Sequence, residues 1–259
     1  MYKFSIGVML LLFSNITQSQ SSYPRIYFEV GYNYQQTKMQ QYNNHLNLIE
    51  TDVFKLDEHL ESVNSLSLAL KYKPKSIFDL GLYLEKQSQT LDRYPMQKKL
   101  NPDLTVTYVE GYHKNQINSC NIGVSATIYV NQLLKLKYHN EFFKRLDFGL
   151  ELKGGVGFSK YFSETHYATF SPIGIGSATR KANGFQGQLG FNFEYSYIKT
   201  PIISSIGIRI GYQFYNTSIL ENQLGYKWGD QKYEWSSAEE PINLDFSGIY
   251  YGIYLKIGK

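Results

Sequence analysis

The strongest constraint on the fold is an alternation of apolar and polar residues that recurs along the chain. In Ser205–Tyr215, SIGIRIGYQFY, every second residue is Ile, Tyr or Phe, and a single charge, Arg209, stands between them. Successive side chains of a β-strand point to opposite faces of a sheet, so this period of two predicts a strand with one apolar face. Arg209 then faces either water, on the outside of a soluble sandwich, or the inside of a barrel whose apolar face contacts lipid.

Seven other segments alternate in the same way, so eight strands are expected. They are Ile26–Tyr34, Leu66–Tyr72, Phe78–Glu85, Ile122–Tyr138, Leu146–Phe158, Phe185–Tyr197 and Ile249–Ile257. The connections are short at Lys73–Ser76, His139–Glu141 and Lys199–Pro201, and long at Gln35–Val63, Lys86–Asn121, Ser159–Gly184 and Asn216–Gly248. Because long and short connections alternate, all long loops lie at one end. Short periplasmic turns and long extracellular loops are typical of an all-β, up-and-down antiparallel transmembrane β-barrel.

The polar faces of these segments favour the barrel over the sandwich. They are rich in Gly and carry isolated charges of both signs, which suits the inside of a narrow closed barrel. The charges expected in the lumen are Glu29, Lys71, Asp79, Glu85, Asp147, Glu151, Lys153, Glu194, Arg209 and Lys256. A lone buried charge is costly, so these residues should pair, with Arg209 bridging Glu194 and Glu151. The pairs form either a structural plug, which is favoured, or a path for a substrate or ion.

Two other architectures remain open. A ten-stranded barrel, acting as a narrow pore or transporter for small solutes, would need Leu104–Tyr112 and part of His45–Phe54 as extra strands. It would put the turns at Lys73–Ser76 and Lys199–Pro201 at opposite ends and spoil the loop asymmetry. A soluble β-sandwich would bury the apolar faces as its core.

The beginning of the chain has the features of a secretory signal peptide, expected over residues 1–21. Lys3 precedes the apolar run Phe4–Phe13, and small polar residues follow. The run is shorter than the ~20 residues that a membrane-spanning helix needs. Residues 22–259 are then expected to form one outer-membrane barrel domain. A single cysteine, Cys120, excludes an internal disulfide, and a net charge of +4 is too small to indicate nucleic-acid binding.

Catalytic signals in the sequence are weak. Ser163, Glu164, His166 and Ser171 lie close together, but a Ser–His–acid site requires converging side chains, which a loop does not promise. The expectation is that the chain is not an enzyme, with an outer-membrane lipid- or peptide-modifying enzyme as the alternative. No metal site and no cofactor is expected.

Two surface features predict interactions. The last long connection holds the aromatic residues Tyr226, Trp228, Tyr233 and Trp235, which suit binding of protein or glycan. Basic residues gather near the short turns, among them Lys75, Lys135, Lys144 and Arg145. They indicate either docking of an acidic periplasmic partner or of anionic headgroups, or only the solubility of the turns.

The signal peptide, the eight alternating segments and the closing segment GIYYGIYLKIGK resemble the small outer-membrane β-barrel proteins of the OmpA/OmpX-like or "porin family" kind common in Bacteroidota. The resemblance covers nearly the whole chain after residue 21, but it rests on a pattern and assigns no functional residue. It implies an outer-membrane location, contact with outer-membrane lipid and insertion by the barrel-assembly machinery. Members act as adhesins, structural barrels, small pores or accessory subunits of secretion and gliding systems. A structural or interaction role with a periplasmic or outer-membrane protein partner is therefore expected.

Overall fold

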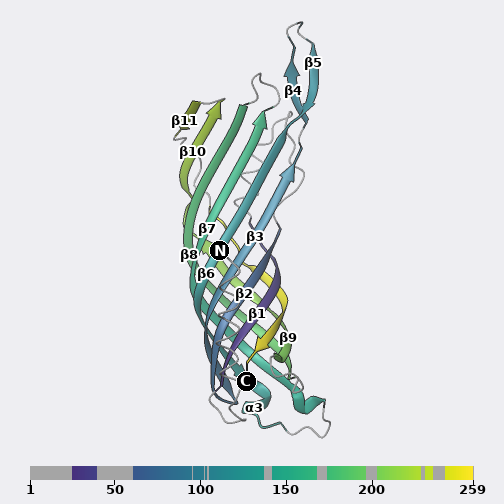
Figure 1. Cartoon of the computed structure of the whole chain (residues 1–259), viewed down its shortest axis with the longest axis vertical. Helices are drawn as coiled ribbons and strands as arrows, with labels where there is room; N and C mark the ends of the chain where they lie inside the picture. Colours follow the sequence, from purple (N-terminus) through teal and green to yellow (C-terminus); the bar gives the residue numbers. More distant parts are fainter. Residues whose placement is uncertain are drawn as a thin grey trace.

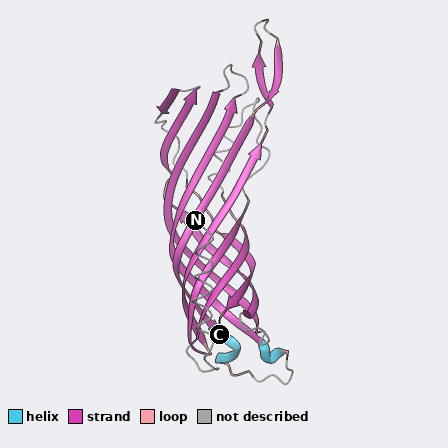
Figure 2. Ribbon diagram, viewed as in Figure 1, coloured by secondary structure: helices cyan, strands magenta, loops and turns pink. Residues whose placement is uncertain are grey.

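The structure is a computed structural model that describes residues 25–39, 61–94, 96–101, 103, 105–136, 142–167, 174–196, 203–228, 231–235 and 243–258. These residues form an elongated antiparallel β structure (Figures 1 and 2). Its elements are β1 (Arg25–Gln36), β2 (Ser62–Lys75), β3 (Phe78–Arg93), β4 (Met96–Leu100), β5 (Val106–Glu110), β6 (Tyr112–Tyr129), α3 (Val130–Leu133), the 3-10 turn η1 (Phe143–Arg145), β7 (Leu146–Tyr167), β8 (Gly174–Ser196), β9 (Ile203–Thr217), β10 (Glu221–Trp228), β11 (Gln231–Trp235) and β12 (Gly248–Ile257). No helix within the described ranges is long and apolar enough to cross a membrane.

Eight of the described strands close into a barrel. Neighbouring strands follow the order β1–β2–β3–β6–β7–β8–β9–β12, and β12 pairs back with β1, always antiparallel. The predicted eight-stranded antiparallel barrel is confirmed. On β9, Arg209 lies opposite Asn192 of β8 and Gly252 of β12, so the register determines its neighbours in the ring.

Side chains in the barrel wall alternate between an apolar outer face and a polar lumen. Val124 and Ile208 point outward and are 61% and 57% exposed, whereas Arg209, between apolar neighbours, is 2% exposed. A soluble sandwich would bury the apolar face instead. The outward apolar residues of β9 run from Ile206 to Phe214, which matches the ~9–11 residues that a tilted strand needs to cross a bilayer. The barrel therefore spans a membrane.

The outer face changes from apolar to polar over two neighbouring rows of the wall. The first row combines Lys86 and Asn183 with Cys120 and Phe158, and the second is polar throughout. Ser88, Asn118, Lys160 and Lys181 form this second, polar row across β3, β6, β7 and β8. Beyond this row the same four strands continue on one side of the barrel, past the ends of β1 and β9 (Figure 1). We call this extension the projecting sheet. It consists of Ser88–Arg93, Tyr112–Asn118, Lys160–Tyr167 and Gly174–Lys181, together with β10, which pairs with β8, and β11, which pairs with β10.

The projecting sheet corrects three predicted long connections. Lys86–Asn121 contains the ends of β3 and β6 that belong to it, and Asn216–Gly248 contains β10 and β11. The segment Ser159–Gly184 was expected to be a connection, but β7 and β8 pair without interruption up to Tyr167 and Gly174. Above the polar row the outer face meets water and not lipid, so the alternation that marks a membrane strand fades while backbone pairing continues.

The ten-stranded alternative is wrong. Leu104–Tyr112 supplies β5, which pairs with β4 in a separate two-stranded sheet and does not enter the ring. The second segment that this alternative needed, His45–Phe54, lies outside the described residues, as do the predicted signal peptide and the predicted turns His139–Glu141 and Lys199–Pro201.

The connections at the other end of the barrel differ from each other. β2 and β3 join through Ser76 and Ile77, in agreement with a short turn there. The predicted strand Ile122–Tyr138 is wrong in its second half, because β6 ends at Tyr129 and α3 follows. The apolar residues after Tyr129 are spaced as on a helix, and the period-two interpretation included them by mistake.

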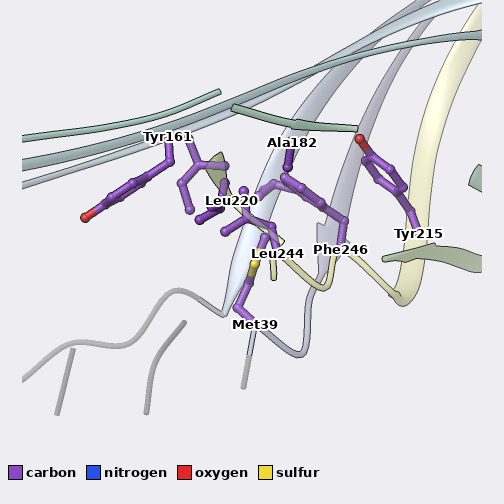
Figure 3. Packing of buried hydrophobic residues seen from close by; sticks show 9 residues of the cluster. Met39, Tyr161, Ala182, Tyr215, Leu220, Leu244 and Phe246 are labelled. Atoms are coloured by element: carbon purple, nitrogen blue, oxygen red, sulfur yellow. The ribbon is translucent and has the colours of Figure 1, made fainter. Parts of the chain in front are cut away.

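An apolar cluster lies where the long connections meet the barrel mouth (Figure 3). Its members are Met39, Val63, Ile117, Tyr161, Ala182, Tyr215, Leu220, Leu244 and Phe246. Met39, Leu244 and Phe246 are at most 1% exposed and come from the connections after β1 and before β12. The Met39 N–H donates to the Asp245 carbonyl (3.1 Å) and the Phe246 N–H to the Tyr215 carbonyl (2.8 Å). Backbone hydrogen bonds thus hold both connections across the mouth.

Candidate functional site

The barrel interior contains a network of buried charges. All sequence-predicted lumen residues except Asp147 are at most 6% exposed, namely Glu29, Lys71, Asp79, Glu85, Glu151, Lys153, Glu194, Arg209 and Lys256. Asp147 is only partly buried. It lies at the short-turn end, where its Oδ1 accepts hydrogen bonds from Asn131 (3.0 Å) and Gln132 (2.9 Å).

Arg209 and Lys71 share the same two carboxylates at the centre of the lumen. Arg209 Nη2 donates to Glu29 Oε1 (2.9 Å), and its Nη1 lies 3.7 Å from Glu151 Oε2. Lys71 Nζ lies 3.2 Å from Glu29 Oε2 and 2.6 Å from Glu151 Oε1. Lys153 Nζ approaches Glu151 Oε2 to 3.5 Å. Each charge therefore has partners of opposite sign, as burial in a low-dielectric interior requires.

The expected pairing of Arg209 with Glu194 is wrong. Glu194 forms its ion pair with Lys256 instead. The β8–β9 register explains the difference, because it sets Asn192 across from Arg209 and moves Glu194 toward the short-turn end. Sequence proximity favoured a partner on the neighbouring strand β8, but the carboxylates that Arg209 meets lie on β1 and β7.

A second cluster, nearer the short turns, is built around Asp79. Tyr27 and Tyr129 both donate hydrogen bonds to Asp79 Oδ2, the latter at 2.6 Å. Lys256 Nζ donates to the Tyr129 hydroxyl (2.7 Å), and Lys71 Nζ lies 3.8 Å from Asp79 Oδ1. Lys71 therefore joins the two clusters into one network. The tyrosines were not predicted as site residues, although their positions share the inward face with the charges.

A layer of carboxamides lies on the mouth side of the charges. Glu85 accepts hydrogen bonds from Ser65 Oγ (2.6 Å), Gln188 (2.8 Å) and Gln186 (3.3 Å). Gln213 Oε1 accepts from Gln186 (2.8 Å) and Gln188 (2.7 Å) as well. These glutamines were not predicted as site residues, yet each occupies an inward position of the alternating pattern.

Interior glycines make room for the large side chains. A Cβ at Gly31 would collide with the Arg209 guanidinium, and a Cβ at Gly207 would collide with the Tyr254 ring. The Arg209 guanidinium carbon lies 4.6 Å from the centre of that ring. The Gly-rich polar face therefore reflects close packing of arginine and tyrosine inside a narrow barrel. Chemically, this interior is a tightly paired plug.

The inner face of the projecting sheet is ordered by side-chain hydrogen bonds. His113 Nδ1 lies 2.7 Å from Thr165 Oγ1, and Asn115 Nδ2 lies 2.9 Å from His113 Nε2. The Tyr161 hydroxyl donates to Asn115 Oδ1 (2.9 Å), and His113, Asn115 and Tyr161 are at most 8% exposed. The outer face carries exposed Lys160 and Lys181. The sheet therefore has a packed inner face and a polar outer face.

The aromatic residues predicted to bind a partner lie on β10 and β11, at the free edge of the projecting sheet. Tyr226 lies opposite Tyr233 and Gly176, and Trp228 lies opposite Gln231 and Gly174. In a further pair Trp235 lies opposite Leu224. The backbone register thus gathers Tyr226, Trp228, Tyr233 and Trp235 in one two-stranded element, while the orientation of their side chains lies outside the described part of the structure.

The Ser–His–acid combination considered from the sequence does not assemble in the described residues. His166 Nε2 lies 2.7 Å from Glu164 Oε1, but Ser163 alternates with them onto the opposite face of β7, and Ser171 lies outside the described residues. Tyr112 packs edge-on against His166, with ring centres 5.1 Å apart. Partial desolvation, with a hydrogen bond to Asp92, raises the pKa of the Tyr112 hydroxyl above its usual value.

No protein-family model and no curated protein matches the sequence. Among solved structures, the chain is similar to Ail, the attachment invasion locus protein of Yersinia pestis (11% identity, TM-score 0.38, covering 92% of this chain and 98% of that chain). A complex of Ail with the heparin analogue sucrose octasulfate gives 11% identity, a TM-score of 0.36 and the same coverage. The outer membrane protease OmpT from Escherichia coli gives 9% identity, a TM-score of 0.39, and coverage of 93% and 98%.

These comparisons correct one expectation. The chain was expected not to be an enzyme, but OmpT is a protease, so barrels to which this chain is similar include an enzyme. The similar structures are outer-membrane barrels, and they do not connect the chain to the OmpA/OmpX-like barrels of Bacteroidota in particular.

Proposed function

We infer that the protein is an integral outer-membrane β-barrel with a structural and interaction role, in which a closed barrel anchors the projecting sheet outside the membrane. The observation that carries this proposal is the asymmetry of the wall. β3, β6, β7 and β8 continue beyond the row of Ser88, Asn118, Lys160 and Lys181, whereas β1 ends at Gln36 and β9 at Thr217. A barrel whose only role was to span the membrane would not need strands that extend beyond it on one side.

The lumen supports anchoring over transport of small solutes. The paired charges and the carboxamide layer fill the interior of the described strands, and Met39, Leu244 and Phe246 cover its mouth. Interiors of eight-stranded barrels are just wide enough for side chains to fill. A pore would need the apolar cluster to move aside.

The partner of the projecting sheet is proposed to be a protein or glycan at the cell surface or in the outer membrane, such as a component of a secretion, gliding or adhesion system. β10 and β11 would form the contact, since Tyr226, Trp228, Tyr233 and Trp235 gather there. Aromatic residues are enriched where proteins bind partners.

The test compares affinity-tagged full-length protein with a variant in which Glu221–Trp235 is replaced by a short polar linker. Both proteins are purified in mild detergent from outer membranes, and co-purifying proteins are quantified. A variant that lacks Met96–Glu110, the β4–β5 hairpin, is the matched control. A stoichiometric partner lost only without β10 and β11 supports the proposal. If all three proteins carry the same partner, or if single-channel steps appear in a planar bilayer, the proposal fails.

A further inference from the structure

The connection between β6 and β7 exposes an unusual number of large apolar side chains. We call its described residues, Val130–Leu136 and Phe142–Arg145, the foot; it contains α3 and η1 and lies at the short-turn end of the barrel (Figure 2). Its exposed apolar side chains are Val130 (39%), Leu133 (54%), Leu134 (61%), Leu136 (49%), Phe142 (53%) and Phe143 (45%). Clustered exposure of this kind marks a surface that is covered by something other than water.

The foot turns its polar side toward the barrel. Asn131 is 5% exposed, donates to the Leu146 carbonyl and to Asp147 Oδ1 (both 3.0 Å), and accepts a hydrogen bond from the Phe148 N–H (3.0 Å). Gln132 donates to Asp147 Oδ1 (2.9 Å) as well. A helix packed on a soluble protein would bury its leucines and expose its amides. Here the amides are hydrogen-bonded to β7, and the leucines point away from the barrel, as the apolar side chains of its outer face do.

The apolar side of the foot continues the lipid-facing surface of the barrel. Val130, the first residue of α3, comes two residues after Ile128 of the outward face of β6, and both side chains are exposed. Phe142 stacks on Tyr195 of β8, with ring centres 5.4 Å apart. The apolar side of the foot therefore adjoins the lipid-facing surface of the barrel, at the short-turn end of the strands.

The charges of the foot have one sign. Its described residues contain Lys135, Lys144 and Arg145 and no acidic residue. The backbone of Lys135 adopts the left-handed conformation (φ 52°), and the Leu136 N–H donates to the Asn131 carbonyl (3.0 Å), which closes the end of α3. Leu134 and Leu136 lie on either side of this left-handed residue, and both side chains are exposed. Apolar side chains beside basic ones are the composition of a segment that lies in a membrane interface.

On these grounds we propose that the foot is an interfacial anchor that docks onto the lipid leaflet at the short-turn end. Leu133, Leu134 and Phe142 enter the boundary between headgroups and acyl chains, and Lys135, Lys144 and Arg145 contact anionic phosphates. The proposal rests on the proposed function, because it needs a barrel that spans a bilayer. A flat docked foot would hold the barrel at one depth and one tilt. Each basic residue near an anionic surface strengthens docking by about fivefold.

The test uses the full chain with Cys120→Ser, reconstituted into phosphatidylcholine vesicles with or without phosphatidylglycerol. A single cysteine for an environment-sensitive fluorophore is introduced by Leu134→Cys in the foot, by Ile208→Cys in the membrane-spanning wall, or by Lys160→Cys above it. Lipids brominated near the carbonyl end of the acyl chain quench a fluorophore that lies in the interface, and lipids brominated near the middle of the chain quench one that lies in the hydrocarbon core; both are used. Resistance to unfolding in cold SDS verifies that each variant is folded.

The expected result is strong quenching at positions 134 and 208 and little at 160. In vesicles with phosphatidylglycerol, combining Lys135→Glu, Lys144→Glu and Arg145→Glu should reduce quenching at 134 severalfold and leave position 208 unchanged. Quenching at 208 without quenching at 134 would overturn the foot as a lipid anchor and leave the membrane barrel intact. That result is the one expected if the foot binds a soluble acidic protein instead of lipid. Equal quenching at 134 with and without the charge reversal would overturn the role of the basic residues. No quenching at 208 would overturn the proposed function itself.

Discussion

The two parts of β7 follow opposite rules, although they belong to one continuous strand. In the membrane-spanning part, Leu152 and Val156 face outward and are exposed, while Glu151 is buried inside. In the projecting sheet, Lys160 faces outward, and Tyr161 is buried in an apolar cluster. Strand direction and pairing do not change between them. What changes is the medium outside the strand, from lipid to water, and the polarity of the inward and outward side chains changes with it.

Within the described residues, a polar lumen replaces a hydrophobic core in the membrane-spanning part, and the apolar cluster lies at the barrel mouth, where Ile117 and Tyr161 of the projecting sheet meet residues of the long connections. The membrane-spanning part is held together internally by ion pairs and carboxamide hydrogen bonds. Because lipid tails are as apolar as the outward side chains, burial of apolar surface contributes little there. Above the membrane, water on the outside restores the usual advantage of an apolar interior.

Loss of a central lumen charge should have the largest effect. Lys71→Met removes the cation that contacts Glu29, Asp79 and Glu151, and leaving buried carboxylates without it should destabilise the folded barrel by about 3–5 kcal/mol. The measurement is urea unfolding of the protein folded in lipid vesicles. Lys181→Met, on the exposed outer face in the polar row, is the control and should have little effect. Equal stability of the two variants would show that the lumen charges are not needed.

Truncation of the apolar cluster should come next. Leu244→Ala removes a fully buried side chain at the barrel mouth and should cost about 2–5 kcal/mol. Ile219→Ala, close to the same cluster in sequence but 59% exposed, should cost much less. Measured by the same unfolding titration, a large loss at Ile219 and none at Leu244 would contradict the packing of this part.

A charge on the outer face should be harmful only within the membrane. Val124→Arg lies in the middle of the apolar stretch of β6 and should cost about 2–4 kcal/mol, whereas Gln116→Arg, on the same face of β6 above the polar row, should cost little. Folding free energies in vesicles give both values. Similar costs would place both positions in the same medium and remove the boundary between the two parts.

The smallest effect is expected for a charge removed from the projecting sheet. Lys160→Ala alters an exposed outward side chain and should change the unfolding free energy by no more than about 0.5 kcal/mol. A loss of unfolding free energy comparable to that of Lys71→Met would mean that the Lys160 side chain makes stabilising contacts and does not simply face water.

The alternation of residues was enough to predict the barrel, its strand number and the inward direction of Arg209. It failed where the physical environment changed. Ser159–Gly184 lost the pattern because water replaces lipid outside, and Ile122–Tyr138 kept an apolar character after the strand had ended because the foot is apolar as well. The lumen residues could be found from alternation, but their pairing could not. Whether Arg209 meets Glu29 or Glu194 depends on strand register and on which strands close the ring, and neither is encoded locally.

The central claim is that the medium outside the strands changes at the row of Ser88, Asn118, Lys160 and Lys181. It is tested most directly by cysteine accessibility along the outer face of β7 and β8, in a Cys120→Ser background in intact outer membranes. Single variants Leu152→Cys, Val156→Cys, Lys160→Cys and Lys181→Cys are treated with a membrane-impermeant maleimide. Rapid labelling at positions 160 and 181 and protection at 152 and 156 is the predicted result. Uniform labelling or uniform protection at all four positions would contradict it.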